Sequence, residues 1–123
     1  MKYDVLVVDD ETSVLYTVKR ILESADLSVC IVNSGKECLE ELGKGFKGLI
    51  LMDVMMPEMD GWDTIKEIVK LGYIDRVIIC MLTAKDVPDE KMDVLKEYVL
   101  DYITKPFKAK KLVAIVKEYL SYI

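Results

Sequence analysis

The stretch VLVVDDE, residues 5–11, runs an apolar segment directly into three consecutive acidic side chains. Two like charges about 4 Å apart repel each other by roughly 4 kcal/mol at an effective dielectric constant near 20. A chain that gathers acids at the end of a buried strand is therefore expected to bring positive charge to the same place. The rest of the sequence indicates where that charge comes from.

Length and composition describe one ordinary globular domain. The 123 residues suit a single hydrophobic core, and 52% of them are hydrophobic and 32% charged. No apolar run approaches the ~20 residues of a membrane span, and the amino-terminal run is too short for a secretory signal. We expect residues 1–123 to form one domain of a cytoplasmic protein with no membrane association.

Charge and residue usage narrow the possible functions. The net charge of −5 argues against direct nucleic-acid binding, which needs a basic face. The sequence has no histidine, so the commonest general base is missing. Its three cysteines, Cys30, Cys38 and Cys80, form no CxxC pair, and a zinc site would have few ligands. We predict that these thiols are reduced and mostly buried.

Apolar segments alternate with amphipathic segments from end to end. Most of the predicted strands are nearly continuous runs of Val, Ile and Leu, which is typical of strands covered on both faces of a parallel sheet. These strands are residues 3–8, 27–32, 48–52, 76–82 and 101–104. The apolar positions with helical spacing are Val14, Leu15, Val18, Ile21 and Leu22; Leu39 and Leu42; Ile65, Ile68 and Val69; Met92, Leu95 and Val99; and Leu112, Ile115, Val116, Tyr119 and Leu120.

Strict alternation of five strands and five helices predicts a doubly wound α/β fold. In this three-layer (βα)5 sandwich, helices cover both faces of a five-stranded parallel sheet. Binding sites in such open sheets form outside the carboxyl ends of the strands. The residues that follow each predicted strand are therefore the candidates for function.

Four of the predicted strands end in polar residues suited to one site. Asp9 and Asp10 follow the first strand, Asp53 the third, Thr83 the fourth and Lys105 the fifth. Clustered carboxylates are tolerated if they hold a hard divalent cation such as Mg²⁺, which prefers oxygen ligands. A lysine and a hydroxyl beside them suit the oxygens of a phosphoryl group. The sequence therefore predicts a combined metal and phosphoryl site.

Four segments, in this order, resemble the receiver domain of two-component response regulators. They are VVDDE (7–11), LILMDVMMPEMDGW (49–62), MLTAKD (81–86) and YITKPF (102–107). Each lies at the carboxyl end of a predicted strand, and the resemblance covers the whole chain. It implies a flavodoxin-like sheet with strand order 2-1-3-4-5.

The resemblance also implies a role for each acid. Asp53 would be the phosphoacceptor and would carry the 4-aspartylphosphate. Asp10 and Asp53 would bind Mg²⁺ through their carboxylates, and Asp9 would hold a metal-bound water. Met55 would contribute its backbone carbonyl, so its apolar side chain is no objection.

Three further residues would carry the signal in a receiver domain. Lys105 would contact the phosphoryl group, and the Lys105–Pro106 peptide bond would be cis. Thr83 would donate a hydrogen bond to the new phosphoryl oxygens, and Tyr102 would move inward. These shifts would remodel the face built from the fourth helix, the fifth strand and the fifth helix.

The function that the resemblance implies is a signalling switch and not an enzyme. A sensor histidine kinase or a phosphotransfer protein would phosphorylate the domain, which would then regulate an unknown downstream effector protein. We expect a monomer or a weak, phosphorylation-dependent dimer. The alternatives are that the chain is the receiver fragment of a longer regulator, or a phosphorelay intermediate.

Three other classes fit the sequence less well. A phosphohydrolase of the haloacid dehalogenase kind needs a second Asp two residues after its nucleophile, where this chain has Met55. A flavodoxin-like electron carrier needs a hydroxyl- and glycine-rich loop after the first strand, where this chain has DDETS (9–13). A receiver-shaped module without phosphorylation is disfavoured by the intact set of acids, threonine and lysine.

Overall fold

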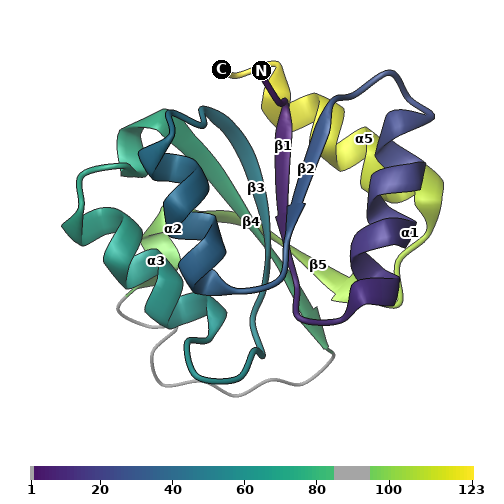
Figure 1. Cartoon of the computed structure of the whole chain (residues 1–123). Helices are drawn as coiled ribbons and strands as arrows, with labels where there is room; N and C mark the ends of the chain where they lie inside the picture. The colour runs from purple at the N-terminus through teal and green to yellow at the C-terminus, as the bar shows by residue number, and fades with distance from the viewer. Residues whose placement is uncertain (1, 85–94) are drawn as a thin grey trace.

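The structure is a computed structural model, and it describes residues 2–84 and 95–123. Its centre is a five-stranded sheet in the order β2-β1-β3-β4-β5 in which all neighbouring strands are parallel (Figure 1). This confirms the predicted doubly wound fold. The strands are β1 (Val5–Val8), β2 (Val29–Val32), β3 (Gly48–Asp53), β4 (Val77–Ala84) and β5 (Val99–Lys105).

Helices cover both faces of this sheet. Helices α1 and α5 lie on one face, and α2 and α3 lie on the other (Figure 1). Two short 3-10 turns, Ile74–Arg76 and Lys96–Tyr98, precede β4 and β5. The α-helices in the described parts of the chain are α1 (Thr12–Glu23), α2 (Gly35–Gly43), α3 (Gly61–Lys70) and α5 (Ala109–Leu120).

The core consists of two clusters, one on each face of the sheet. Successive side chains of a strand point to opposite faces, so β1 contributes Leu6 and Val8 to one cluster and Val5 and Val7 to the other. All four are fully buried. Burial of each such side chain contributes about 1.5–3 kcal/mol. The central strands are therefore fixed from both sides, which also fixes the residues at their carboxyl ends.

One predicted helical stripe is partly wrong. Val99 was expected on a helix with Met92 and Leu95, but it is the first residue of β5 and pairs with Ile79 of β4. Its β-branched side chain is buried in the sheet, where such residues pack well. The sheet pairing therefore outweighs the helical spacing. Met92 lies outside the described residues.

The helices that approach the candidate site begin at defined caps. Ser34 caps α2, where its Oγ accepts a hydrogen bond of 3.1 Å from the Glu37 amide. Asp60 and Asp63 form a capping box at the start of α3, with reciprocal bonds of 2.8 and 3.2 Å. A cap of this kind typically contributes about 1 kcal/mol. The capping box thereby fixes the point at which the chain turns from β3 into α3.

The three cysteines are free thiols. Cys38 and Cys80 are buried, and burial raises the pKa of each to about 12. Cys30 is half-buried, and its Sγ lies 3.7 Å from Glu41 Oε1. The prediction of reduced, mostly buried thiols is confirmed. Across residues 2–84 and 95–123, no helix combines the length and apolar character needed to cross a membrane.

Candidate functional site

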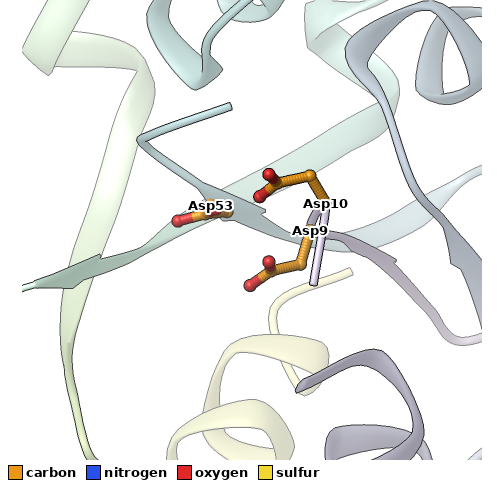
Figure 2. Close-up of side chains that lie close together, drawn as sticks. All are labelled: Asp9, Asp10 and Asp53. Carbon is orange, nitrogen blue, oxygen red and sulfur yellow. The ribbon is translucent and has the colours of Figure 1, made fainter. Parts of the chain in front are cut away.

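Three carboxylates meet at the carboxyl edge of the sheet. Asp9 and Asp10 follow β1, and Asp53 ends β3, the neighbouring strand. Val8 pairs with Met52, so the residues after them emerge side by side. One oxygen from each of the three carboxylates lies within 4.8 Å of the other two (Figure 2). The juxtaposition predicted from the strand ends is therefore present.

The three acids differ in their exposure. Asp9 has no exposed surface and Asp53 is 6% exposed, whereas Asp10 is exposed to solvent. Asp9 Oδ1 accepts a hydrogen bond of 2.9 Å from the Glu11 amide. A buried carboxylate is costly unless it is paired and hydrogen-bonded. Asp9 and Asp53 therefore need a positive partner inside the protein.

Lys105 supplies that positive charge from the end of β5. Its Nζ lies 2.8 Å from Asp9 Oδ2 and 3.3 Å from Asp53 Oδ1. Only 23% of the lysine side chain is exposed, so these ion pairs are shielded from bulk water. The lysine therefore offsets part of the repulsion among the acids that VLVVDDE first indicated.

The negative charge that Lys105 does not neutralise affects the pKa of Asp53. Burial and the charge of Asp9 raise the pKa of Asp53 to about 7, although Lys105 and a hydrogen bond from the Met55 amide lower it. Burial alone would lower the pKa of Lys105, but its hydrogen bond to Asp9 and its carboxylate neighbours raise it. The site thus keeps the lysine charged and carries an excess of negative charge.

This donor set fits a hard divalent cation. All three groups offer carboxylate oxygens, and the exposed Asp10 lies on the solvent side. Magnesium binds through one or two carboxylates and keeps several waters, which this arrangement allows. With every group ionised, three carboxylates and one ammonium leave two negative charges, which a divalent cation would balance. Charge and donor type therefore agree.

Thr83 lies at the same edge with its hydroxyl engaged. It follows Leu82, which pairs with Asp53 across β3 and β4. The Thr83 Oγ1 donates a hydrogen bond of 2.9 Å to the carbonyl oxygen of Ala84. A new acceptor group bound to Asp53 would therefore have to compete with that carbonyl oxygen for the hydrogen bond from the Thr83 hydroxyl. Met55, two residues after Asp53, has a side chain that is 64% exposed.

The remaining predicted residues lie along and beyond β5. The Lys105–Pro106 peptide bond is cis. Tyr102 is partly buried, and its hydroxyl is fully enclosed. Its ring packs against Trp62, with the ring centroids 6.4 Å apart. In this structure Tyr102 thus already has its polar end directed inward.

Two residues near the site were missed in the sequence. Gly61 approaches the phosphoacceptor candidate so closely that a Cβ there would lie 2.5 Å from the carbonyl oxygen of Asp53. Trp62 follows it and is the only tryptophan in the chain. The glycine in the pair GW after Asp60 was the available signal, because glycine allows a close approach that a Cβ would prevent.

The comparisons with known proteins agree with this geometry. The profile of the response regulator receiver domain matches residues 5–117. This chain belongs to the response regulator receiver domain family. A solved response regulator receiver domain protein (CheY-like) from Methanospirillum hungatei JF-1 superposes on this receiver domain with a TM-score of 0.93 and 45% sequence identity, covering 97% of this chain and 94% of that one.

Curated relatives of this receiver domain are longer proteins. The transcriptional regulatory protein ZraR of Escherichia coli (strain K12) is 35% identical over 119 residues, 97% of this chain and 26% of ZraR. The alkaline phosphatase synthesis transcriptional regulatory protein PhoP of Bacillus subtilis (strain 168) is 34% identical over 120 residues, 98% of this chain and 49% of PhoP. The receiver domain thus spans about a quarter to a half of these relatives.

The family places the domain in two-component signalling. This agrees with the resemblance identified in the sequence and favours a receiver over a phosphohydrolase or a flavin carrier. Both curated relatives are named as transcriptional regulators. The expectation that this chain makes no direct contact with nucleic acid is therefore not confirmed and stays a prediction for residues 1–123.

Proposed function

We propose that this receiver domain is a Mg²⁺-dependent phosphoacceptor switch in which Asp53 accepts the phosphoryl group. The observation that carries the proposal is the position of Asp53, which lies beside Asp9 and Asp10 and 3.3 Å from Lys105 Nζ. Mg²⁺ bound by Asp10, Asp53 and the backbone carbonyl of Met55, with Asp9 holding one of its waters, would neutralise these acids and the phosphoryl oxygens.

Asp53 is better suited to attack phosphorus than the other two acids. Both oxygens of Asp9 already accept hydrogen bonds, one from the Glu11 amide and one from Lys105. Asp10 is exposed, so a cation that arrives from solvent would reach this carboxylate first. Asp53 is largely buried at the end of β3, and Lys105, which would bind the phosphoryl oxygens, lies 3.3 Å from its Oδ1. Its neighbours therefore position it, and it supplies the reacting oxygen.

The transfer is a displacement at phosphorus. An Asp53 oxygen forms a bond to phosphorus, and the bond between phosphorus and the donor breaks. The donor leaves with its electron pair, as acetate when acetyl phosphate is used. Lys105 would bind a phosphoryl oxygen instead of sharing its hydrogen bonds between Asp9 and Asp53 alone.

Thr83 would respond to the phosphoryl group on Asp53 and pass the change to the rest of the domain. Its hydroxyl would leave the Ala84 carbonyl and donate to a phosphoryl oxygen, which accepts a stronger hydrogen bond because it is charged. Tyr102 on the adjacent strand would respond to that movement, because Thr83 pairs with Thr104 of β5, two residues further along.

The partners follow from this chemistry. A sensor histidine kinase or a phosphotransfer protein would donate the phosphoryl group, and a downstream effector would recognise the modified domain. We propose a monomer or a weak dimer that forms on phosphorylation. The relatives' greater length also fits the alternative that this receiver domain acts within a longer regulator.

Mass spectrometry after incubation with acetyl phosphate and Mg²⁺ tests the assignment. We expect one phosphoryl group per chain, mapped to Asp53, and no adduct when Mg²⁺ is removed by a chelator. Asp53→Asn should abolish the adduct. Asp75→Asn, which changes an exposed acid outside the site, should leave it unchanged. A phosphoryl group on any other residue of the wild-type chain would overturn the proposal.

A further inference from the structure

Trp62 and Tyr102 form an aromatic pair between two elements that are distant in sequence. Trp62 is the second residue of α3, and Tyr102 lies in β5. The indole is 2% exposed, and the two rings are tilted by 44° with their centroids 6.4 Å apart. The pair therefore joins the helix that follows Asp53 to the strand that carries Lys105.

The polar atoms of this pair are buried without hydrogen bonds. Among the residues that the structure describes, Trp62 Nε1 and the Tyr102 hydroxyl oxygen are the two buried side-chain atoms that lack a partner. Unsatisfied buried polar groups are uncommon in folded proteins. The indole N–H is a donor and the phenol oxygen can accept, so the two groups are complementary. A hydrogen bond between them would satisfy both.

The backbone that carries Trp62 is in direct contact with Asp53. The Gly61 amide donates a hydrogen bond of 2.9 Å to the carbonyl oxygen of Val54. A Cβ at Gly61 would lie 2.5 Å from the Asp53 carbonyl oxygen, so there is no free space between these segments. A displacement of the Asp53 backbone is therefore passed to the start of α3.

Met81 also lies close to Gly61. Its Cε would lie 2.9 Å from a Cβ at Gly61, and its backbone pairs with Tyr102 across β4 and β5. Met81 also lies two residues before Thr83 on the same strand. Met81 thus links the aromatic pair to the strand that carries Thr83.

We propose that Trp62 is a positioning residue for Tyr102. It holds the Tyr102 ring inward in the unmodified domain, and modification of Asp53 brings the indole N–H into a hydrogen bond with the Tyr102 hydroxyl. This inference rests on the proposed phosphorylation of Asp53. It adds one specific contact, made by the Trp62 side chain, which lies outside the metal and phosphoryl site. This contact would form when Asp53 is modified.

Fluorescence tests this directly because Trp62 is the sole tryptophan. Mg²⁺ with beryllofluoride, which stands in for the phosphoryl group, should shift the wild-type emission to longer wavelength as the indole N–H gains a partner. Tyr102→Phe keeps the ring and removes the acceptor, so it should lose at least half of the shift. Tyr16→Phe, which alters an exposed tyrosine on α1, should keep the full shift.

A second measurement separates positioning from simple packing. Trp62→Phe keeps an aromatic ring but has no N–H donor. In this variant, beryllofluoride should still move the amide resonances around Asp53, whereas the movement at Tyr102 should fall at least twofold. Thermal melting of each variant identifies any loss of fold. Tyr102→Phe removes a hydroxyl that has no partner within residues 2–84 and 95–123, so this variant should fold.

The outcomes distinguish this inference from the proposed function. A full emission shift in Tyr102→Phe, or a wild-type chain that is phosphorylated on Asp53 without any shift, would overturn the inference alone. An equal movement at Tyr102 in Trp62→Phe and wild type would also overturn it. If mass spectrometry finds no phosphoryl group on Asp53, the proposed function fails, and the inference fails with it.

Discussion

The Nζ of Lys105 lies 2.8 Å from Oδ2 of Asp9, a carboxylate that has no exposed surface. The two residues come from the ends of strands β5 and β1, which are separated in the sheet by β3 and β4. Removal of one partner from a buried ion pair leaves an uncompensated charge, which is far more costly than the pair itself. The stability of this edge therefore depends on the lysine whenever no cation is bound.

Lys105→Met should lower the free energy of unfolding of the metal-free domain by about 3–5 kcal/mol. Added Mg²⁺ should recover part of this loss, because the cation would take over neutralisation of the acids. Urea unfolding with chelator and with Mg²⁺ measures both effects. Lys110→Met, which changes an exposed lysine of α5, serves as the control and should change little. Equal effects of the two substitutions would contradict the proposed role of Lys105.

Protonation of Asp53 should make the stability of the domain depend on pH. Its pKa is raised from 3.8 to about 7, so the folded chain holds a proton that the unfolded chain releases between these values. This contribution to stability is fully present below pH 3.8 and is lost as the pH rises to about 7. Without metal, the domain should therefore lose stability as the pH increases from about 4 to about 7.

Asp53→Asn isolates that contribution. The amide cannot ionise, so the variant should lack this part of the pH dependence and should be about 1–3 kcal/mol more stable than wild type near pH 8 without metal. Chemical unfolding in the presence of a chelator, at several pH values, measures the difference. If the variant is less stable than wild type near pH 8, the Asp53 charge is well compensated by its neighbours, and this prediction is wrong.

Gly61→Ala should destabilise the fold by about 1–3 kcal/mol, since its Cβ would press on the backbone carbonyl of Asp53. It should also slow phosphorylation by acetyl phosphate, because Asp53 would be displaced. Gly43→Ala is the matched control. A Cβ there would lie 3.7 Å from the Tyr73 hydroxyl, an ordinary contact. Differential scanning calorimetry should find only Gly61→Ala destabilised, and similar losses in both variants would contradict the close approach.

Thr83→Ala should separate the chemical step from the response. Among the residues that the structure describes, its hydroxyl donates to the adjacent carbonyl of Ala84, so the stability of the unmodified domain should change by less than about 1 kcal/mol. Asp53 should still be phosphorylated, but the amide resonances of β5 should move less than in wild type. Nuclear magnetic resonance with beryllofluoride measures this. An undiminished response of β5 would remove Thr83 from the proposed switch.

The fold and the strand ends could be predicted well because both depend on local pattern. Continuous apolar runs are expected of a doubly covered parallel sheet, and polar residues at their carboxyl ends must share one edge. Asp9, Asp10 and Asp53 could therefore be placed together from the order of residues alone. The same reasoning failed at Val99, where helical spacing and strand pairing compete and the sheet decides.

Other features depend on contacts through space that no local pattern contains. The hydrogen bond from the Thr83 hydroxyl to the Ala84 carbonyl depends on the side-chain rotamer of Thr83. The pKa of Asp53 depends on its burial and on the Asp9 charge from another strand. The packing of Trp62 against Tyr102 joins residues 40 positions apart, and a lone tryptophan in the sequence has no visible partner.

Calorimetric titration with Mg²⁺ tests most directly whether acids from separate strands are held together for a cation. The wild-type domain should bind one Mg²⁺, and Asp10→Asn should weaken binding at least about tenfold, because the variant loses a charged oxygen ligand. Asp75→Asn should bind as wild type does. Absence of Mg²⁺ binding in the wild type, or equal affinity in Asp10→Asn and wild type, would contradict the proposed metal site.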